Sequence, residues 1–124
     1  MKLRIRGNSI RFRLSRSELD QLGSLGVVRD SIDFGTGASL NYGIEVGAAD
    51  NLTVSFNSHT ILVALPELLA ERWALPEEVA VRSDQPLGAS ENLSILLEKD
   101  YACLAPREGA EDADSFPNPA GRDT

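Results

Sequence analysis

The sequence of 124 residues has little of what disulfide-bonded, secreted or membrane-spanning proteins need. Its single cysteine, Cys103, excludes an intramolecular disulfide, which indicates a reducing compartment and a cytoplasmic protein. The longest uninterrupted apolar run, Ile61 to Leu65, is far shorter than the roughly 18 residues of a membrane span. No apolar stretch follows the basic N-terminus, so we expect no signal peptide and no membrane partner.

Residues that commonly carry catalysis or bind metals are equally scarce. His59 is the only histidine and lies in a predicted turn, where an exposed side chain is the usual finding. A metal site using Cys103 and His59 would need at least one or two more ligands, and Asp100 is only a formal candidate. Glu98 and Asp100 share a strand face, but exposed acids at a strand end are common. We therefore expect no enzyme, no catalytic residue, no metal and no cofactor.

Charge is distributed very unevenly along the chain. The first 16 residues contain six basic side chains and no acid, whereas the whole chain has a net charge of −7. Because that stretch contributes +6 to the total of −7, the remaining residues carry −13. A net acidic chain argues against general nucleic-acid binding, but a concentrated basic surface can still bind an anion locally.

The N-terminal stretch predicts a β-hairpin with one basic face. Apolar and basic residues alternate on both sides of Gly7-Asn8, and these two residue types favour a tight turn. If they are the central turn residues, Ile5 lies opposite Ile10 and Arg4 opposite Arg11. The same register collects all the basic side chains of the hairpin on one face, namely Lys2, Arg4, Arg6, Arg11 and Arg13.

Like charges that face each other across strands need a counter-charge. One hypothesis is that these five residues bind an outside anion or nucleic acid, since guanidinium groups bind phosphates in bidentate fashion. The alternative is that they pair with acids of this chain, such as Asp30, Asp33, Glu45 or the C-terminal tail. An acidic tail folding over the basic face would also be autoinhibitory. The residues leave these alternatives open.

The rest of the chain reads as short strands and two helices. Ser15 and Glu18 fit a capping box, which predicts a helix with Leu19 and Leu22 inward that ends at Gly23 or Gly26. Pro66 suits the first position of a second helix that ends before Pro76 and points Trp73 to the core. Alternation predicts further strands at Val27–Phe34, Ser39–Val46, Leu52–Phe56, Thr60–Leu65, Val79–Val81 and Leu93–Leu97.

The two halves of the chain repeat the same order of elements. Leu3 matches Leu52, Asn8 matches Asn57 and Ile10 matches Ile61, although any strand-rich chain shows some self-similarity. We therefore predict a mostly β (α+β) fold, an antiparallel β-barrel-like domain of two pseudo-symmetric ββαββ units with two short helices. The domain spans residues 1–104, with units at 1–49 and 50–104. The acidic, proline-containing tail at 105–124 is expected to be flexible.

Two resemblances follow from these motifs. Over nearly its full length the chain resembles a small bacterial family of unknown function, through the opening MKLRIRGNSIRFRL, the segment LEKDYACLAPR and an acidic FPNP tail. That resemblance implies no activity. The hairpin–helix unit is similar to the swapped-hairpin superfamily of AbrB and MazE, through its GNS turn followed by a strand, a short helix and two more strands.

The second similarity covers residues 2–46 and, more loosely, 52–99. It implies hairpins exchanged to form one barrel, and contacts to DNA by Arg4, Arg6, Arg11 and Arg13. The chain departs from the superfamily at Ser15, where a proline is usual, and in the absence of the usual Gly-Asp before the third strand.

For function, the sequence favours a non-enzymatic binding or protein-interaction module. The alternative is a DNA-binding transcription regulator or antitoxin-like protein that uses the basic hairpin. The expected partner is accordingly an unidentified protein or anionic ligand, with DNA as the second candidate. The protein is expected to be a monomer or a homodimer.

Overall fold

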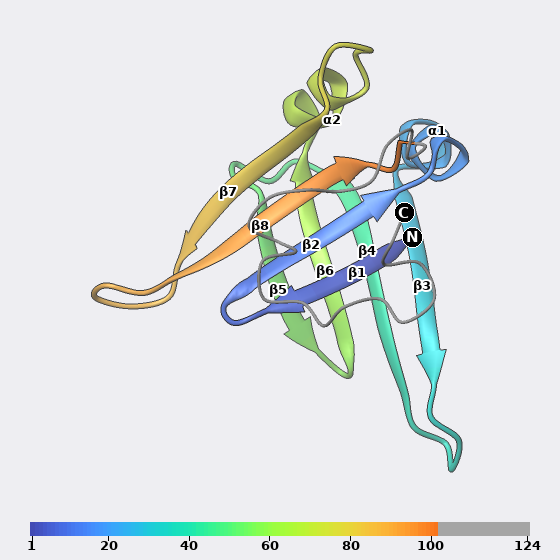
Figure 1. Cartoon of the computed structure of the whole chain (residues 1–124), viewed down its shortest axis with the longest axis vertical. Helices are drawn as coiled ribbons and strands as arrows, with labels where there is room; N and C mark the ends of the chain where they lie inside the picture. Colours follow the sequence, from blue (N-terminus) through green and yellow to red (C-terminus); the bar gives the residue numbers. More distant parts are fainter. Residues whose placement is uncertain (102–124) are drawn as a thin grey trace, which may run out of the picture.

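The computed structural model describes residues 1–101 of the chain. They form eight strands and two helices, in an order shown in Figure 1. The elements are β1 (Lys2–Arg6), β2 (Ser9–Leu14), α1 (Arg16–Leu25), β3 (Val27–Asp33), β4 (Ser39–Gly47), β5 (Thr53–Asn57), β6 (Thr60–Pro66), α2 (Glu67–Trp73), β7 (Ala80–Pro86) and β8 (Asn92–Lys99). The predicted sheet-rich α+β class is therefore confirmed.

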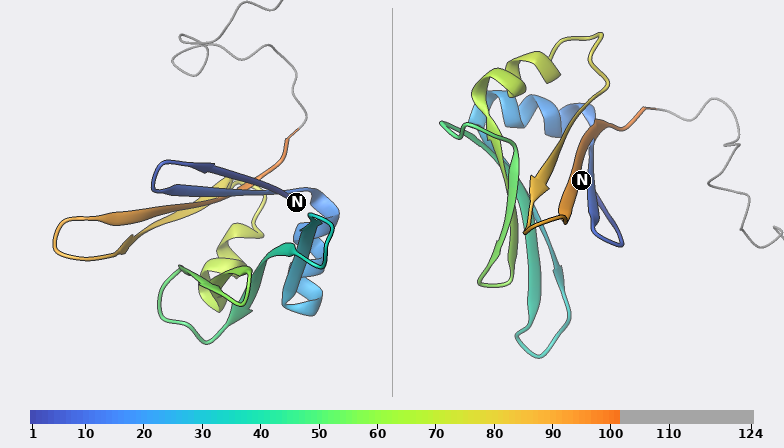
Figure 2. Two further views of the ribbon diagram at one scale, coloured as in Figure 1. Left: turned by 90° about the horizontal axis from the view of Figure 1, so that it is seen from below. Right: turned by 90° about the vertical axis from the view of Figure 1, so that its left-hand side faces the viewer.

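The strands form two four-stranded sheets that each combine both halves of the chain. Sheet A has the order β1-β2-β8-β7, and sheet B has the order β3-β4-β6-β5. The two sheets lie face to face, with both helices at one end (Figure 2). In each sheet, a hairpin from one half lies beside two antiparallel strands from the other half.

Two parts of the predicted architecture are corrected by this topology. The sheets are not purely antiparallel, because β2 pairs with β8 and β4 pairs with β6 in parallel. Nor do the described strands close into a barrel, because each sheet ends in two edge strands that no backbone ladder joins to the other sheet. The prediction failed because the alternation of side chains fixes their faces but does not identify the partner of a strand.

One side-chain link does connect an edge of each sheet. The Gln85 side chain on β7 accepts a hydrogen bond from the Val54 amide on β5 (2.7 Å) and donates one to the Val54 carbonyl (3.2 Å). Gln85 thus satisfies two polar groups of an edge residue that would otherwise lack a strand partner.

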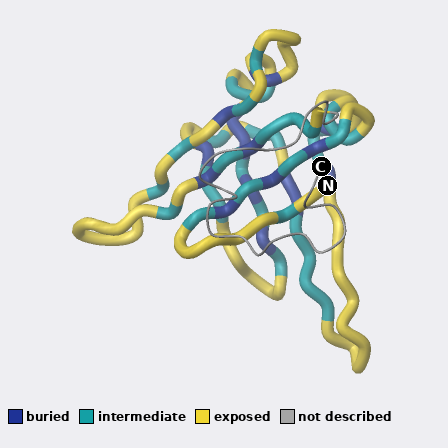
Figure 3. Tube along the Cα trace, in the orientation of Figure 1, coloured by how far each residue is buried: buried dark blue, intermediate teal, exposed yellow. Residues whose placement is uncertain are grey.

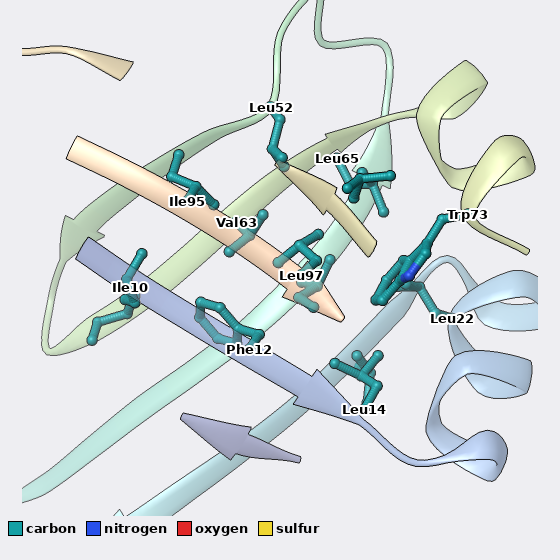
Figure 4. Packing of buried hydrophobic residues seen from close by; sticks show 14 residues of the cluster. Ile10, Phe12, Leu14, Leu22, Leu52, Val63, Leu65, Trp73, Ile95 and Leu97 are labelled. Carbon is teal, nitrogen blue, oxygen red and sulfur yellow. The ribbon is translucent and has the colours of Figure 1, made fainter. Parts of the chain in front are cut away.

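The core lies between the two sheets. Phe12, Leu14 and Leu97 of sheet A, together with Val63 and Leu65 of sheet B, are almost completely buried. Figure 4 shows these side chains packed with one another and with residues from the helices. Burial alternates along the central strands, whereas the edge strands and hairpin ends are exposed (Figure 3). This alternation places the residues between the core positions on the outer faces.

The first helix begins at the predicted capping box. The Ser15 hydroxyl accepts from the Glu18 amide, and the Glu18 carboxylate accepts from the Ser15 amide (2.9 Å). Glu18 also binds the α-amino group of Met1. Burial raises the pKa of the Glu18 carboxyl, but the α-amino group and the Ser15 amide together hold it below its ordinary value. The helix continues through Gly23 and ends at Gly26, whose positive φ suits glycine.

The second helix packs Trp73 into the core, as predicted. Its indole is fully buried, and the ring N–H donates to the Val79 carbonyl (3.4 Å). Pro66 ends β6 and caps the helix instead of occupying its first position. No helix within residues 1–101 is long and apolar enough to cross a membrane.

Candidate anion-binding surface

The structure places all five predicted basic residues on the outer face of sheet A. Their strand register is the predicted one, with Lys2 opposite Arg13 and Arg4 opposite Arg11. Arg82 of β7 lies on the same face, because Arg11 pairs with Leu96 and Leu96 pairs with Arg82. We call this surface the basic face and define it by Lys2, Arg4, Arg6, Arg11, Arg13 and Arg82.

Glu98 lies beside Arg13 at one end of the basic face and neutralises part of it. Its Oε1 accepts hydrogen bonds from Arg13 Nε (3.0 Å) and Nη2 (2.8 Å), and lies 3.5 Å from Arg11 Nε. All three side chains are more than two-thirds buried. A carboxylate this close to two guanidinium groups relieves the repulsion that the register of β1 and β2 would otherwise create.

A second carboxylate lies at the rim of the face. Lys2 Nζ binds Asp100 Oδ2 at 3.0 Å, immediately after the end of β8. The hydrogen bond from Lys2 holds the pKa of the Asp100 carboxyl below its ordinary value. Glu98 and Asp100, which the sequence suggested as a pair of acids, therefore each serve as counter-ions to bases of the N-terminal hairpin.

The other three basic residues of the face take no part in these ion pairs. Arg4, Arg6 and Arg82 are exposed, and none forms an ion pair with another residue of the described range 1–101. Asp84, the only other acid on this face, pairs with Ser94 in the strand register. Six basic side chains thus share the surface with three carboxylates, and the balance stays positive.

The acids that the sequence offered as internal partners lie elsewhere. Asp30 lies 3.8 Å from the α-amino group of Met1, and Glu45 pairs with Arg29 (3.6 Å). Asp33 accepts from the Gly35 amide in the β3–β4 turn (2.8 Å). Two of the arginines are therefore paired internally, but with Glu98, and the carboxylate that binds Lys2 is Asp100.

The other candidates from the sequence are His59, Cys103 and the acidic tail. His59 is exposed and lies in the β5–β6 turn with a positive φ. Within residues 1–101, no group of three metal-binding side chains lies together. Cys103 and the acidic tail lie outside the described residues.

The sequence did not predict that Arg82 lies on the basic face or that Glu98 pairs with two of its arginines. Arg82 lies on β7 and Glu98 on β8, and these strands join the first hairpin only through the parallel pair β2–β8. The contacting residues of that pair are far apart in the chain, since Arg13 and Glu98 are separated by 85 positions. The alternation around Val81, which is buried, places Arg82 outward but does not reveal which sheet it joins.

The outer face of sheet B provides a natural comparison. Arg29 is the only basic residue in its four strands, and it is paired with Glu45. Most other outward positions carry small or uncharged side chains, such as Ser55, Leu62 and Thr60. The positive surface is therefore a property of one sheet only.

An open face of this kind suits an extended anion better than a small molecule. Guanidinium groups offer bidentate hydrogen bonds to carboxylates and phosphates, and exposed ones keep that capacity. The cations are spread over three strands of a sheet. An extended anion with several charged groups is therefore the candidate ligand of this surface.

Comparisons with known proteins add a family but no function. The model of a protein family described only as a family of unknown function matches residues 1–120. No curated protein and no solved structure matches the chain.

Proposed function

Since this chain belongs to a family of unknown function (DUF7009), we propose its role from its own geometry: a non-enzymatic binding module. Its basic face binds an anionic partner through Arg4, Arg6 and Arg82, while Arg11 and Arg13 are partly neutralised by Glu98. The single observation that carries this proposal is the excess of basic over acidic groups on one sheet.

We also propose that the scaffold arose by duplication of a ββαββ unit. The registers support this, because the pairs of β1–β2 recur in β5–β6 at an interval of 51 residues: Arg4 pairs with Arg11, and Ser55 with Leu62. The pairs of β3–β4 recur in β7–β8 at an interval of 53, since Val27 pairs with Glu45 as Ala80 does with Glu98. By this register Asn8 matches His59, not Asn57.

The duplication sharpens the argument for the basic face. In the proposed alignment, Glu98 matches Glu45 and Arg82 matches Arg29, so the two strand pairs share one arginine and one glutamate at matching positions. The five basic residues of the first hairpin instead match Thr53, Ser55, Asn57, Leu62 and Ala64. Only the first copy therefore has a basic hairpin, although the hairpins of both copies bury apolar residues in the same core.

The test is retention of the full chain on immobilised heparin, a sulfated polyanion, as salt is raised. An Arg4→Gln, Arg6→Gln, Arg82→Gln variant removes three cations that have no ion pair within residues 1–101. We expect it to elute at much lower salt than the parent protein, because phosphate-like contacts are salt-dependent.

The matched control changes three arginines outside the basic face. An Arg16→Gln, Arg29→Gln, Arg72→Gln variant has the same net charge, and its losses are confined to exposed pairs. It should elute close to the parent. If both variants shift equally, net charge alone explains retention and the proposal fails.

DNA is a second candidate partner. The observation that favours it is that the arginines lie on the β1–β2 hairpin, which pairs with strands from the second half of the chain. A DNA-binding regulator or antitoxin-like protein would bind duplex DNA with an affinity that falls steeply with salt. Loss of three phosphate contacts should reduce the slope of log K against log salt by about 2.7. No binding of duplex DNA at low salt by a chain that heparin retains would exclude this candidate.

A further inference from the structure

We propose that the basic face binds an acidic peptide segment, and that residues 106–124 of the same chain supply it. This inference rests on the proposed function, because it assigns an occupant to the same surface. It goes further by giving the face a partner that is present in every copy of the protein, with which any outside anion must compete.

The charges of the two partners are complementary. Residues 106–124 contain five acids and two arginines, and four of the acids lie within seven residues: Glu108, Glu111, Asp112 and Asp114. The basic face retains three exposed guanidinium groups with no carboxylate partner among residues 1–101. Sheet B offers no comparable target, since its one strand arginine is paired with Glu45.

The point at which the chain leaves the described part favours the same surface. β8 is a central strand of sheet A, and the Asp100 amide donates to the Leu14 carbonyl (2.9 Å). The Asp100 carboxylate is bound to Lys2, which belongs to the basic face. The chain therefore leaves the described part at the rim of the proposed site, one residue after Asp100, which is held there by an ion pair.

The stretch of chain between Tyr101 and the acids is long enough to reach across the basic face. An extended chain spans up to about 3.3–3.6 Å per residue, so the seven residues that follow Tyr101, up to Glu108, reach roughly 24 Å. The outer face along β2, from Leu14 to Ser9, is six residues long, or about 20 Å. The acids at 108–114 can therefore meet every arginine of the face.

Covalent connection makes a weak contact effective. Exposed ion pairs contribute little individually, but a short tether gives the segment a local concentration in the millimolar range. Such a contact weakens with salt and is displaced by a partner of higher charge density. The segment would act as an internal competitor that admits only strongly anionic partners.

A spin-label experiment on the full chain tests where the segment binds. A nitroxide is attached at position 112 of a Cys103→Ser, Asp112→Cys variant, and amide signals are compared at low salt and at 1 M salt, where the Debye length is about 3 Å. We expect broadening at Arg4, Arg11 and Arg82 that is lost at high salt. Broadening centred on sheet B, or on the hollow between the helices lined by Leu19, Pro76 and Tyr101, would overturn the proposal.

Charge neutralisation in the full chain provides an independent test. A Glu108→Gln, Glu111→Gln, Asp112→Asn, Asp114→Asn variant should elute from heparin at higher salt than the parent. The matched control neutralises four exposed acids elsewhere, Asp50, Glu67, Glu71 and Glu77, and gives the same net charge. Equal shifts in the two variants would overturn the internal competitor.

These outcomes separate the two proposals. If the triple arginine variant loses retention and tail neutralisation changes nothing beyond its control, the basic face binds anions and the internal occupant is wrong. If the triple arginine variant is retained like the parent, the proposed function itself is wrong.

Discussion

Glu98 is the residue that neutralises Arg11 and Arg13 on the basic face. Its carboxylate binds Arg13 through two hydrogen bonds and lies beside Arg11, and it is the most buried member of this group. The residue that matches it in the proposed duplication, Glu45, has one exposed partner at 3.6 Å. Two glutamates in corresponding positions therefore face very different charge surroundings.

Glu98→Gln should both weaken the fold and strengthen anion binding. Loss of a charge-assisted bond to partly buried guanidinium groups is expected to lower the free energy of unfolding by about 1–2 kcal/mol. The freed Arg11 and Arg13 should raise the salt needed to elute the protein from heparin. Glu45→Gln is the control, and an equal rise in elution salt would show that Glu98 has no special role.

Glu18 should make stability depend on pH in the acid range. Its pKa is lowered in the folded state from an ordinary value of 4.5, so its stabilisation is complete above that value and is lost as pH falls through the folded pKa. Glu18→Gln should lower the free energy of unfolding by about 1 kcal/mol at pH 7.

Urea denaturation at pH 7, 5 and 3 measures this dependence. The difference between Glu18→Gln and the parent should shrink at pH 3, because a protonated glutamate no longer holds the α-amino group. Glu71→Gln, an exposed change on α2, is expected to be neutral throughout. A constant difference at all three pH values would contradict the electrostatic explanation.

At the scale of single elements, the two hairpin turns differ in backbone strain. Gly7 has a positive φ of 54° in the first turn, which glycine adopts freely. The second turn requires positive φ at both Ser58 (50°) and His59 (60°), the pattern of a type I′ turn. Neither residue is suited to it, and no side-chain chemistry of His59 is needed to explain its position.

Ser58→Asn with His59→Gly should therefore stabilise the protein. The left-handed conformation costs a non-glycine residue roughly 1–2 kcal/mol, partly offset by the greater freedom of glycine when unfolded. We expect a net gain of about 1 kcal/mol in the free energy of unfolding, measured by thermal or chemical denaturation. Gly7→Ala should have the opposite sign, and a destabilised Asn-Gly variant would refute the turn assignment.

Local patterns predicted most elements and the register of the first hairpin. Alternation and Gly7-Asn8 are sufficient there, because both strands and their turn are adjacent in the chain. The pattern failed at β7, which continues from Ala80 to Pro86, whereas alternation had predicted a strand only at Val79–Val81, because polar residues and a proline follow. The edge position of β7 tolerates that composition, since Pro86 needs no donor on its free side.

At the scale of the whole molecule, the alternation of residues did not predict the exchange of hairpins between the halves, which only the resemblance to the swapped-hairpin superfamily had implied. The inward residues of β2 look the same whether they pack against the first half or the second. The composition of the basic face depends on this exchange, because Glu98 and Arg82 reach Arg11 only across the parallel pair. The five basic residues within one hairpin were therefore predictable, whereas the position of Arg82 and the ion pairs of Glu98 were not.

Cutting the chain tests this interdependence. Each sheet takes two strands from each half, so fragments 1–49 and 50–124 each lack half of both sheets. We expect each fragment alone to be unfolded as a monomer, and an equimolar mixture to recover dispersed amide signals in NMR spectra. A fragment that folds as a monomer by itself would show that the exchange is dispensable.

The pairing of β2 with β8 also has a consequence for synthesis of the protein on the ribosome. Ser9 is made early, but its neighbour Ser94 emerges only when almost all of residues 1–101 have been translated. Until then, β8 cannot yet pair with β2, which contains Phe12 and Leu14, two residues that are buried in the folded protein. Sheet A can therefore be completed only after β8 has been translated, and until then its apolar residues favour aggregation.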